Sequence, residues 1–156
     1  MKFSTREDVE APIDATFDML TDHEGFARQA IRRGAEVQRT DSRAEPGPGM
    51  MWDVAFSMRG RRRQLSLQMD RFDRPNEIGL SFVTDGLTGT FTAECLALSK
   101  NRTRVQIALE LSPQNLSARL LVQSLKLAKT SLTKRFKLRV ADYAKTMEER
   151  YQSRSA

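Results

Sequence analysis

Cysteine, histidine and long apolar runs are nearly or wholly absent from this chain of 156 residues. Cys95 stands alone, which excludes an internal disulfide framework and suits a reducing compartment. No apolar run approaches the ~20 residues of a membrane-spanning helix. The charged start, Lys2 to Glu10, has no signal-peptide core. We therefore expect a cytoplasmic protein whose residues 1–156 form one domain.

Signatures of metal, nucleotide and catalytic sites are also missing. The chain has no HExxH, CxxC, P-loop or GxGxxG motif, so we expect neither a metal nor a cofactor. His23 is the only histidine and lies at a predicted helix junction. Cys95 has no neighbouring histidine or second cysteine to activate it, so a buried thiol is the simpler interpretation. No catalytic constellation is visible, and whether the protein is an enzyme stays open.

Positive charge is in excess, and the excess lies at one end of the chain. Residues 1–115 contain 16 Lys and Arg against 17 Asp and Glu, whereas residues 116–156 contain 10 against 3. Such an end can attract nucleic acid, anionic membranes or acidic partners, but a solvated helix face is the simpler explanation. A second basic cluster, Arg59 to Arg63, lacks the interleaved aromatic residues of a single-strand binding platform. We therefore do not expect nucleic-acid binding.

Apolar residues recur at steps of three or four along the last quarter of the chain. They predict one helix from Asn115, its N-cap, to about Gln152. At ~1.5 Å per residue this helix would be roughly 55 Å long and would need a large apolar surface to lie on. The stripe consists of Leu121, Leu125, Ala128, Leu132, Phe136, Val140, Tyr143 and Met147.

A second line of leucines lies on another side of this helix, rotated by more than about 120° from the stripe at 100° per residue. It consists of Leu116, Leu120, Leu127 and Leu138, with Lys134 and Lys145 on the same line. Three interpretations compete. The first is packing under the two N-terminal helices, the second is a two-fold homodimer, and the third is contact with anionic lipid.

Before the last quarter, the apolar period is mostly two. A strand covers residues 2–10, two short helices follow Pro12 and end before Gly34, and six strands run from Ala35 to Leu111. Turn signals such as Asp85-Gly86 separate the strands at hairpin spacing. The fold class is therefore α+β: a curved, seven-stranded antiparallel sheet around a long C-terminal helix, with one apolar face per strand.

Three segments resemble the polyketide cyclase/dehydrase and lipid-transport families of the SRPBCC superfamily. They are VEAPIDATFDMLTD (9–22), WDVAFSMRGRRRQ (52–64) and NRTRVQIALEL (101–111). The resemblance implies the START-like helix-grip fold, in which the sheet curls around the long helix and leaves a cavity. Members bind lipids, hormones, polyketides or other apolar molecules, and only some are enzymes. The matching motifs are structural, and no universal catalytic residue carries over.

The candidate ligand-binding residues are those that the alternation places on the inner face. The set is apolar apart from Glu7 and Arg39. Each of these two is in phase with apolar neighbours that we expect to be buried on its strand. They are therefore candidates for an ion pair at one end of a pocket. A packed core without a cavity remains the alternative. The full set is Glu7, Arg39, Trp52, Val54, Phe56, Met58, Leu67, Met69, Leu80, Phe82, Phe91, Cys95, Ile107, Leu125 and Leu132.

We thus expect a protein that binds, transports or senses an apolar small molecule between the sheet and the C-terminal helix. One alternative is an enzyme of the aromatic polyketide cyclase type, in which the shape of the cavity orients the substrate. The other is a nucleic-acid or membrane-surface module that uses the basic helix.

Overall fold

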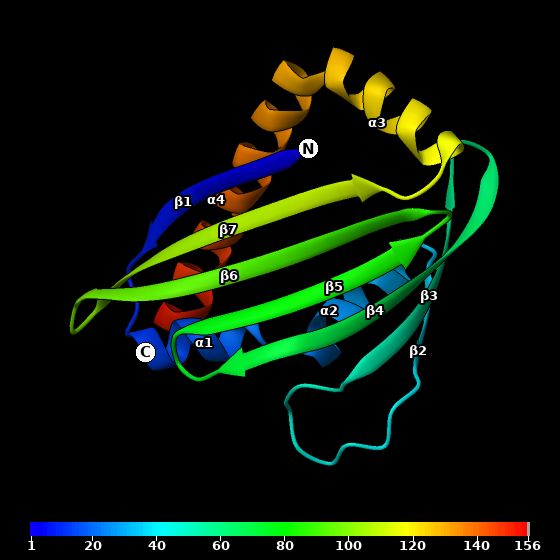
Figure 1. The fold of residues 1–156 in the computed structure, drawn as a ribbon. Coiled ribbons are helices and arrows are strands. Elements are labelled where there is room, and N and C mark those ends of the chain that lie inside the picture. The colour runs from blue at the N-terminus through cyan, green and yellow to red at the C-terminus, as the bar shows by residue number, and fades with distance from the viewer. Residues whose placement is uncertain (156) are drawn as a thin grey trace.

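The computed structural model describes residues 1–155, and a seven-stranded antiparallel sheet forms its centre (Figure 1). The strand order is β1-β7-β6-β5-β4-β3-β2, so consecutive strands pair except that β1 joins the last strand. The strands are β1 Lys2–Val9, β2 Glu36–Arg39, β3 Met51–Met58, β4 Arg61–Asp73, β5 Glu77–Thr84, β6 Leu87–Ser99 and β7 Arg102–Pro113. The predicted seven-stranded α+β fold is confirmed.

Tight two-residue turns set the register of two hairpins. Asp85 and Gly86 both have positive φ values, 45° and 75°, and Thr84 pairs with Leu87 across the turn. Arg59 and Gly60 make the same kind of turn between β3 and β4. Turns with positive φ at both central residues match the twist of paired strands. The register they fix keeps the alternating apolar residues on one face of the sheet.

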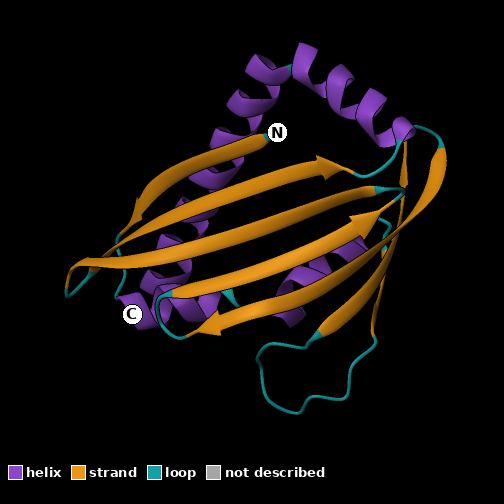
Figure 2. Ribbon diagram, viewed as in Figure 1, coloured by secondary structure: helices purple, strands orange, loops and turns teal. Residues whose placement is uncertain are grey.

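Three helices cover that apolar face (Figures 1 and 2). They are α1 Ile13–Leu20, α2 His23–Arg32 and α4 Lys129–Ser155. The side chain of Asp22 caps α2 by accepting a hydrogen bond from the Gly25 N–H at 3.1 Å. The C-terminal half of α4 packs with α1 against the strands, and Phe17 and Met147 are fully buried there. The main packed core therefore lies at the α1 end of the sheet.

The C-terminal helical segment is bent, and the expectation of one continuous helix is wrong. Helix α3, Leu116–Leu127, ends at Ala128, whose φ and ψ of −103° and 14° leave the helical region, and α4 begins at the next residue. No glycine or proline marks this position. The cause is tertiary, because the two helices pack on different clusters. Ala118 and Val122 of α3 pack with Leu87 of β6 in a cluster separate from the main core.

Candidate ligand-binding cavity

A cavity of about 570 Å³ lies between the concave face of the sheet and helices α2 and α4. Its volume falls within the range of about 300–1,000 Å³ that small-molecule sites occupy. The sheet contributes apolar side chains from β2 through β7, and the helices close the other side. The strand residues are Val37, Trp52, Val54, Leu67, Met69, Ile78, Leu80, Phe82, Phe91, Ile107 and Leu109. The helices and the α1–α2 junction add Leu20, Thr21, His23, Phe26, Ala27, Ala30, Phe136, Arg139, Val140 and Tyr143.

Several of these inward-facing side chains are only half buried, which distinguishes the cavity from the packed core. Leu80 and Phe91 lie on the two central strands β5 and β6 and face the helices, yet neither is fully buried. Ala93, one alternation further along β6, is almost completely buried under α1. The same face of one strand is therefore packed at one end and hollow at the other.

Helix α2 forms the outer wall of the cavity and has no buried residue of its own. Phe26, Ala27 and Ala30 line the cavity, and Phe26 keeps 39% of its surface exposed. An amphipathic helix ordinarily buries its apolar side against a core. Here that side faces a cavity, so α2 has the fewest packing constraints of the elements around the site.

Few polar groups line the cavity. The His23 ring lies 6.0 Å from the Trp52 ring, centroid to centroid. The Tyr143 hydroxyl donates to the Met19 carbonyl at 3.1 Å, and burial raises the pKa of this phenol. Arg139 is the one permanently charged lining residue, and no carboxylate lines the wall. The Arg139 side chain forms no ion pair or hydrogen bond within residues 1–155 and is exposed, which leaves its guanidinium available to a ligand.

The structure brings together a large part of the predicted set. The strand residues predicted from alternation that line the cavity are Trp52, Val54, Leu67, Met69, Leu80, Phe82, Phe91 and Ile107. They converge because one face of neighbouring strands must point to one side of the sheet. Whether they contact a ligand stays a prediction.

Other predicted residues lie elsewhere. Phe56 lines a neighbouring hollow of about 510 Å³ beside the C-terminal half of α2, and Met58 is exposed near the β3–β4 turn. Cys95 belongs to the packed core, where burial raises the pKa of its thiol to about 11. Leu125 and Leu132 are half buried on α3 and α4 but are not part of the cavity wall.

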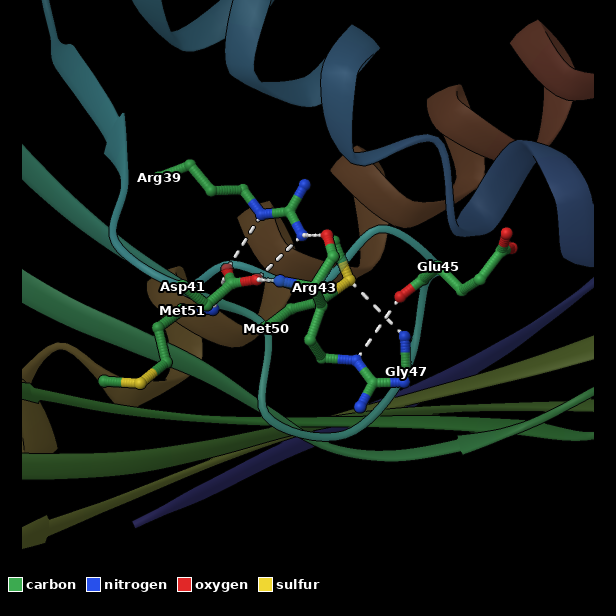
Figure 3. Close-up of polar contacts among 7 residues, drawn as sticks. All are labelled: Arg39, Asp41, Arg43, Glu45, Gly47, Met50 and Met51. Atoms are coloured by element: carbon green, nitrogen blue, oxygen red, sulfur yellow. Dashed lines mark hydrogen bonds and ion pairs between the residues drawn. The ribbon is translucent and has the colours of Figure 1, made fainter.

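The proposed Glu7–Arg39 ion pair is wrong. Glu7 lies on β1 and Arg39 on β2, and these strands are the two opposite edges of the sheet. Glu7 instead pairs across the sheet with Val105 of β7. Arg39 binds Asp41 in a bidentate pair, with Nε and one terminal nitrogen each 2.8 Å from a carboxylate oxygen (Figure 3). Neither Glu7 nor Arg39 lines the cavity.

Asp41 organises the long loop between β2 and β3 that Figure 2 shows in teal. Besides Arg39, its carboxylate accepts hydrogen bonds from the backbone N–H groups of Arg43 and Met51, both at 2.8 Å. Only 7% of the Asp41 side chain is exposed. The Arg39 guanidinium and the Met51 N–H hold the pKa of Asp41 far below its usual range. This loop is fixed beside Trp52, which pairs with Arg39 across the strands.

The residues that strand alternation missed come mainly from the helices. Phe26, Ala27 and Ala30 share one side of α2, and Val140 and Tyr143 belong to the apolar stripe of α4. Their periodicity indicates that they face inward. It does not indicate which inward-facing residues line a cavity, since that depends on how far each helix stands from the sheet. Arg139 carries no sequence signal of its own.

No cluster of three or more His, Cys, Asp or Glu suited to a metal ion occurs in the described part of the chain. Searches against protein-family models and against curated proteins find no match.

The fold nevertheless matches solved structures. The Zhui aromatase/cyclase from Streptomyces sp. R1128 superposes with a TM-score of 0.61 and 15% identity, over 86% of this chain and 88% of its own. Ara h 8.0201 superposes with a TM-score of 0.60 and 13% identity, over 98% of both chains. A START superfamily protein from Mycobacterium smegmatis gives a TM-score of 0.55 at 13% identity, over 86% and 95%. The chain therefore has the START-like helix-grip fold that the sequence segments resemble.

Proposed function

We propose that this protein binds an apolar small molecule in the cavity between the sheet, α2 and α4, as a carrier or sensor. The observation that supports this is an open cavity of about 570 Å³ whose wall is almost entirely apolar. Apolar surface that faces water in a cavity is less stable than the same surface when covered, by roughly 25 cal/mol per Å². An apolar ligand removes that cost, as water cannot.

The single charged group on the wall suggests the shape of the ligand. Arg139 lies on α4 one turn before Tyr143 and has no acidic partner among the described residues. A ligand with an apolar body and an acidic end would place its body against Phe82 and Phe91 and its charge beside the guanidinium. We therefore include an acidic end in the proposed ligand.

Trp52, the only tryptophan, lines the cavity and gives a direct test of binding. We expect N-phenyl-1-naphthylamine, a neutral apolar dye, to bind saturably and to quench Trp52 fluorescence by energy transfer. Ala27→Phe fills the cavity from α2 and should weaken the dye at least tenfold. Arg28→Phe, on the exposed side of the same helix, is the matched control and should bind as the wild type does. Absence of saturable binding, or equal binding by Ala27→Phe, overturns the proposal.

The acidic end has its own test. We compare displacement of the dye by dodecanoate and by dodecanol, which share the apolar chain and differ in charge. The wild type should prefer the acid by about fivefold or more, equivalent to a single exposed charge contact, and Arg139→Gln should lose the preference. Lys137→Gln, an exposed α4 residue outside the wall, is the control. Equal affinities in the wild type would contradict the acidic end while leaving cavity binding intact.

A second candidate, a reaction of the cyclase type, rests on His23. It is the one imidazole on the wall, and histidine is the side chain that most often serves as a general acid or base. If His23 is the general base of such a reaction, it reaches the proton that is removed. Glutamine cannot take that proton, so His23→Gln should abolish turnover of a poly-β-ketone substrate analogue. Unchanged turnover by this variant, or no turnover by the wild type, removes this candidate.

A further inference from the structure

Helix α3 has apolar residues on two roughly opposite sides. On the inner side, Ala118 and Val122 are buried against Leu87 and the strands. On the outer side, three leucines, Leu116, Leu120 and Leu127, keep 72%, 59% and 92% of their surface exposed. At 100° per residue these three lie within about 40° of one another, so they form one surface, which we term the leucine face.

The expectation that this line of leucines packs beneath the N-terminal helices is wrong. All three residues of the leucine face are exposed, and so is Leu138 of α4. The bend at Ala128 is the reason, because α3 turns away from the direction of α4 and stands apart from α1 and α2 (Figure 1). The leucine face therefore has no partner within residues 1–155.

The helical segment that carries the leucine face has charged residues of one sign only. Residues 116–141 contain seven Lys and Arg and no Asp or Glu. Arg119 and Lys126 lie beside the leucines on one side of α3, and Lys129 follows the bend. None of these three forms an ion pair within the part of the chain that the structure describes.

The other basic cluster of the molecule is different. In the β3–β4 hairpin, Nη2 of Arg62 lies 3.3 Å from Oε1 of Glu36. Nη1 of Arg63 lies 3.2 Å from Oδ2 of Asp85. Those arginines are balanced locally by carboxylates, whereas the charges beside the leucine face are not. The field of the basic end is therefore available to an external anionic surface.

We propose that the leucine face docks on the surface of an anionic lipid bilayer. An interfacial helix inserts its large apolar side chains at the level of the acyl chains and keeps lysine and arginine among the headgroups. The exposed leucines and the basic residues beside them on α3 and at the start of α4 supply both parts. No helix in residues 1–155 is long and apolar enough to cross a membrane, so the contact is peripheral.

A second copy of the chain fits this face less well. Two leucine faces brought together would oppose basic segments that contain no acidic residue. Like charges at a desolvated interface oppose association. An anionic bilayer instead supplies the missing charge along with apolar depth. This proposal does not depend on the cavity, which is formed by other elements.

The test uses co-sedimentation of the full chain with lipid vesicles. We expect binding to phosphatidylcholine vesicles that contain about 30% phosphatidylserine, and binding at least tenfold weaker to pure phosphatidylcholine. Raising the salt from about 0.1 to 0.5 M should weaken the anionic binding, since the Debye length shortens. Leu120→Glu with Leu127→Glu should weaken it at least tenfold.

A matched double variant separates insertion from charge. Leu96→Glu with Leu98→Glu changes two exposed leucines on β6 and alters the net charge by the same amount. It should retain the greater part of the binding, and both variants should keep the wild-type circular dichroism. Equal loss in the two variants, or no wild-type binding to anionic vesicles, overturns the proposal. So does a wild-type dimer that Leu127→Glu converts to a folded monomer in sedimentation, because the face would then be a self-interface.

Discussion

The Tyr143 hydroxyl donates a hydrogen bond to the Met19 carbonyl, 124 residues away in the sequence, at 3.1 Å. The bond ties the middle of α4 to the last turn of α1, beside the junction from which α2 starts. The Tyr143 ring also contacts Phe26 of α2, with centroids 5.6 Å apart. One side chain therefore fixes the three helical elements that surround the cavity.

Removing only that hydroxyl tests its contribution. Tyr143→Phe keeps the ring and its contact with Phe26 but leaves the Met19 carbonyl without this donor. We expect the free energy of unfolding to fall by about 1 kcal/mol, measured as a shift of the urea midpoint at unchanged slope. Dye binding in the cavity should persist because the apolar wall is intact. An unchanged midpoint would show that the bond contributes nothing.

Gly89 controls the position of a cavity side chain. A Cβ atom at Gly89 would overlap the ring of Phe82, its cross-strand partner. Gly89→Ala should therefore push the Phe82 ring into the cavity, lower stability by about 1–3 kcal/mol and weaken dye binding. Gly89→Ala combined with Phe82→Leu should recover both. Gly79→Ala, where the nearest atom to the added Cβ is Arg71 Cβ at 3.3 Å, is the milder comparison. Tight dye binding by Gly89→Ala would contradict the account.

Asp41 should make stability depend on acid pH. Arg39 and the Met51 N–H lower the pKa of Asp41 in the folded state. The ionised carboxylate therefore adds to the free energy of unfolding above the ordinary carboxyl pKa of about 4, and this contribution is lost as the pH falls below that value. Asp41→Asn should lower the urea midpoint at pH 7, and the midpoint of this variant should fall less than that of the wild type as the pH is lowered. Asp53→Asn, an exposed carboxylate on β3, should do neither. Parallel pH profiles for wild type and Asp41→Asn would refute this role.

Cys95 should be inert while the protein is folded. Burial raises its pKa to about 11, and the thiolate is the reactive form. We expect no reaction with iodoacetamide at pH 8 in buffer, and incorporation of one equivalent of the reagent in urea, measured by mass.

The unfolded chain ionises the Cys95 thiol at lower pH than the folded protein does, so ionisation of this thiol favours unfolding from about pH 9 upward. Rapid labelling in buffer would show that the site opens.

Sequence patterns predicted the concave face well because side-chain direction in a strand is a local property. Trp52 and Val54 on β3 and Leu67 and Met69 on β4 alternate, and the register that the β3–β4 turn fixes brings them to one face. The boundary between packed core and cavity is not local. Leu80 and Ala93 carry the same pattern, and only the helix above each decides whether it is covered.

The errors have the same origin. The Glu7–Arg39 pair assumed that strands separated by two helices were neighbours, whereas β1 pairs with β7. Helix continuity through Ala128 followed from an unbroken apolar stripe with no glycine or proline. The bend comes from two separate packing clusters, which no periodicity reveals.

The pairing of β1 with β7 affects how the chain is made. Residues 2–9 leave the ribosome well before their partners, residues 103–110, which are about a hundred positions behind. At about 5–20 residues per second, the first strand waits roughly 5–20 s for its partner. Meanwhile β3 to β6 can close as successive hairpins with short loops. Translation should therefore deliver a curved meander first, onto which both ends of the chain close last.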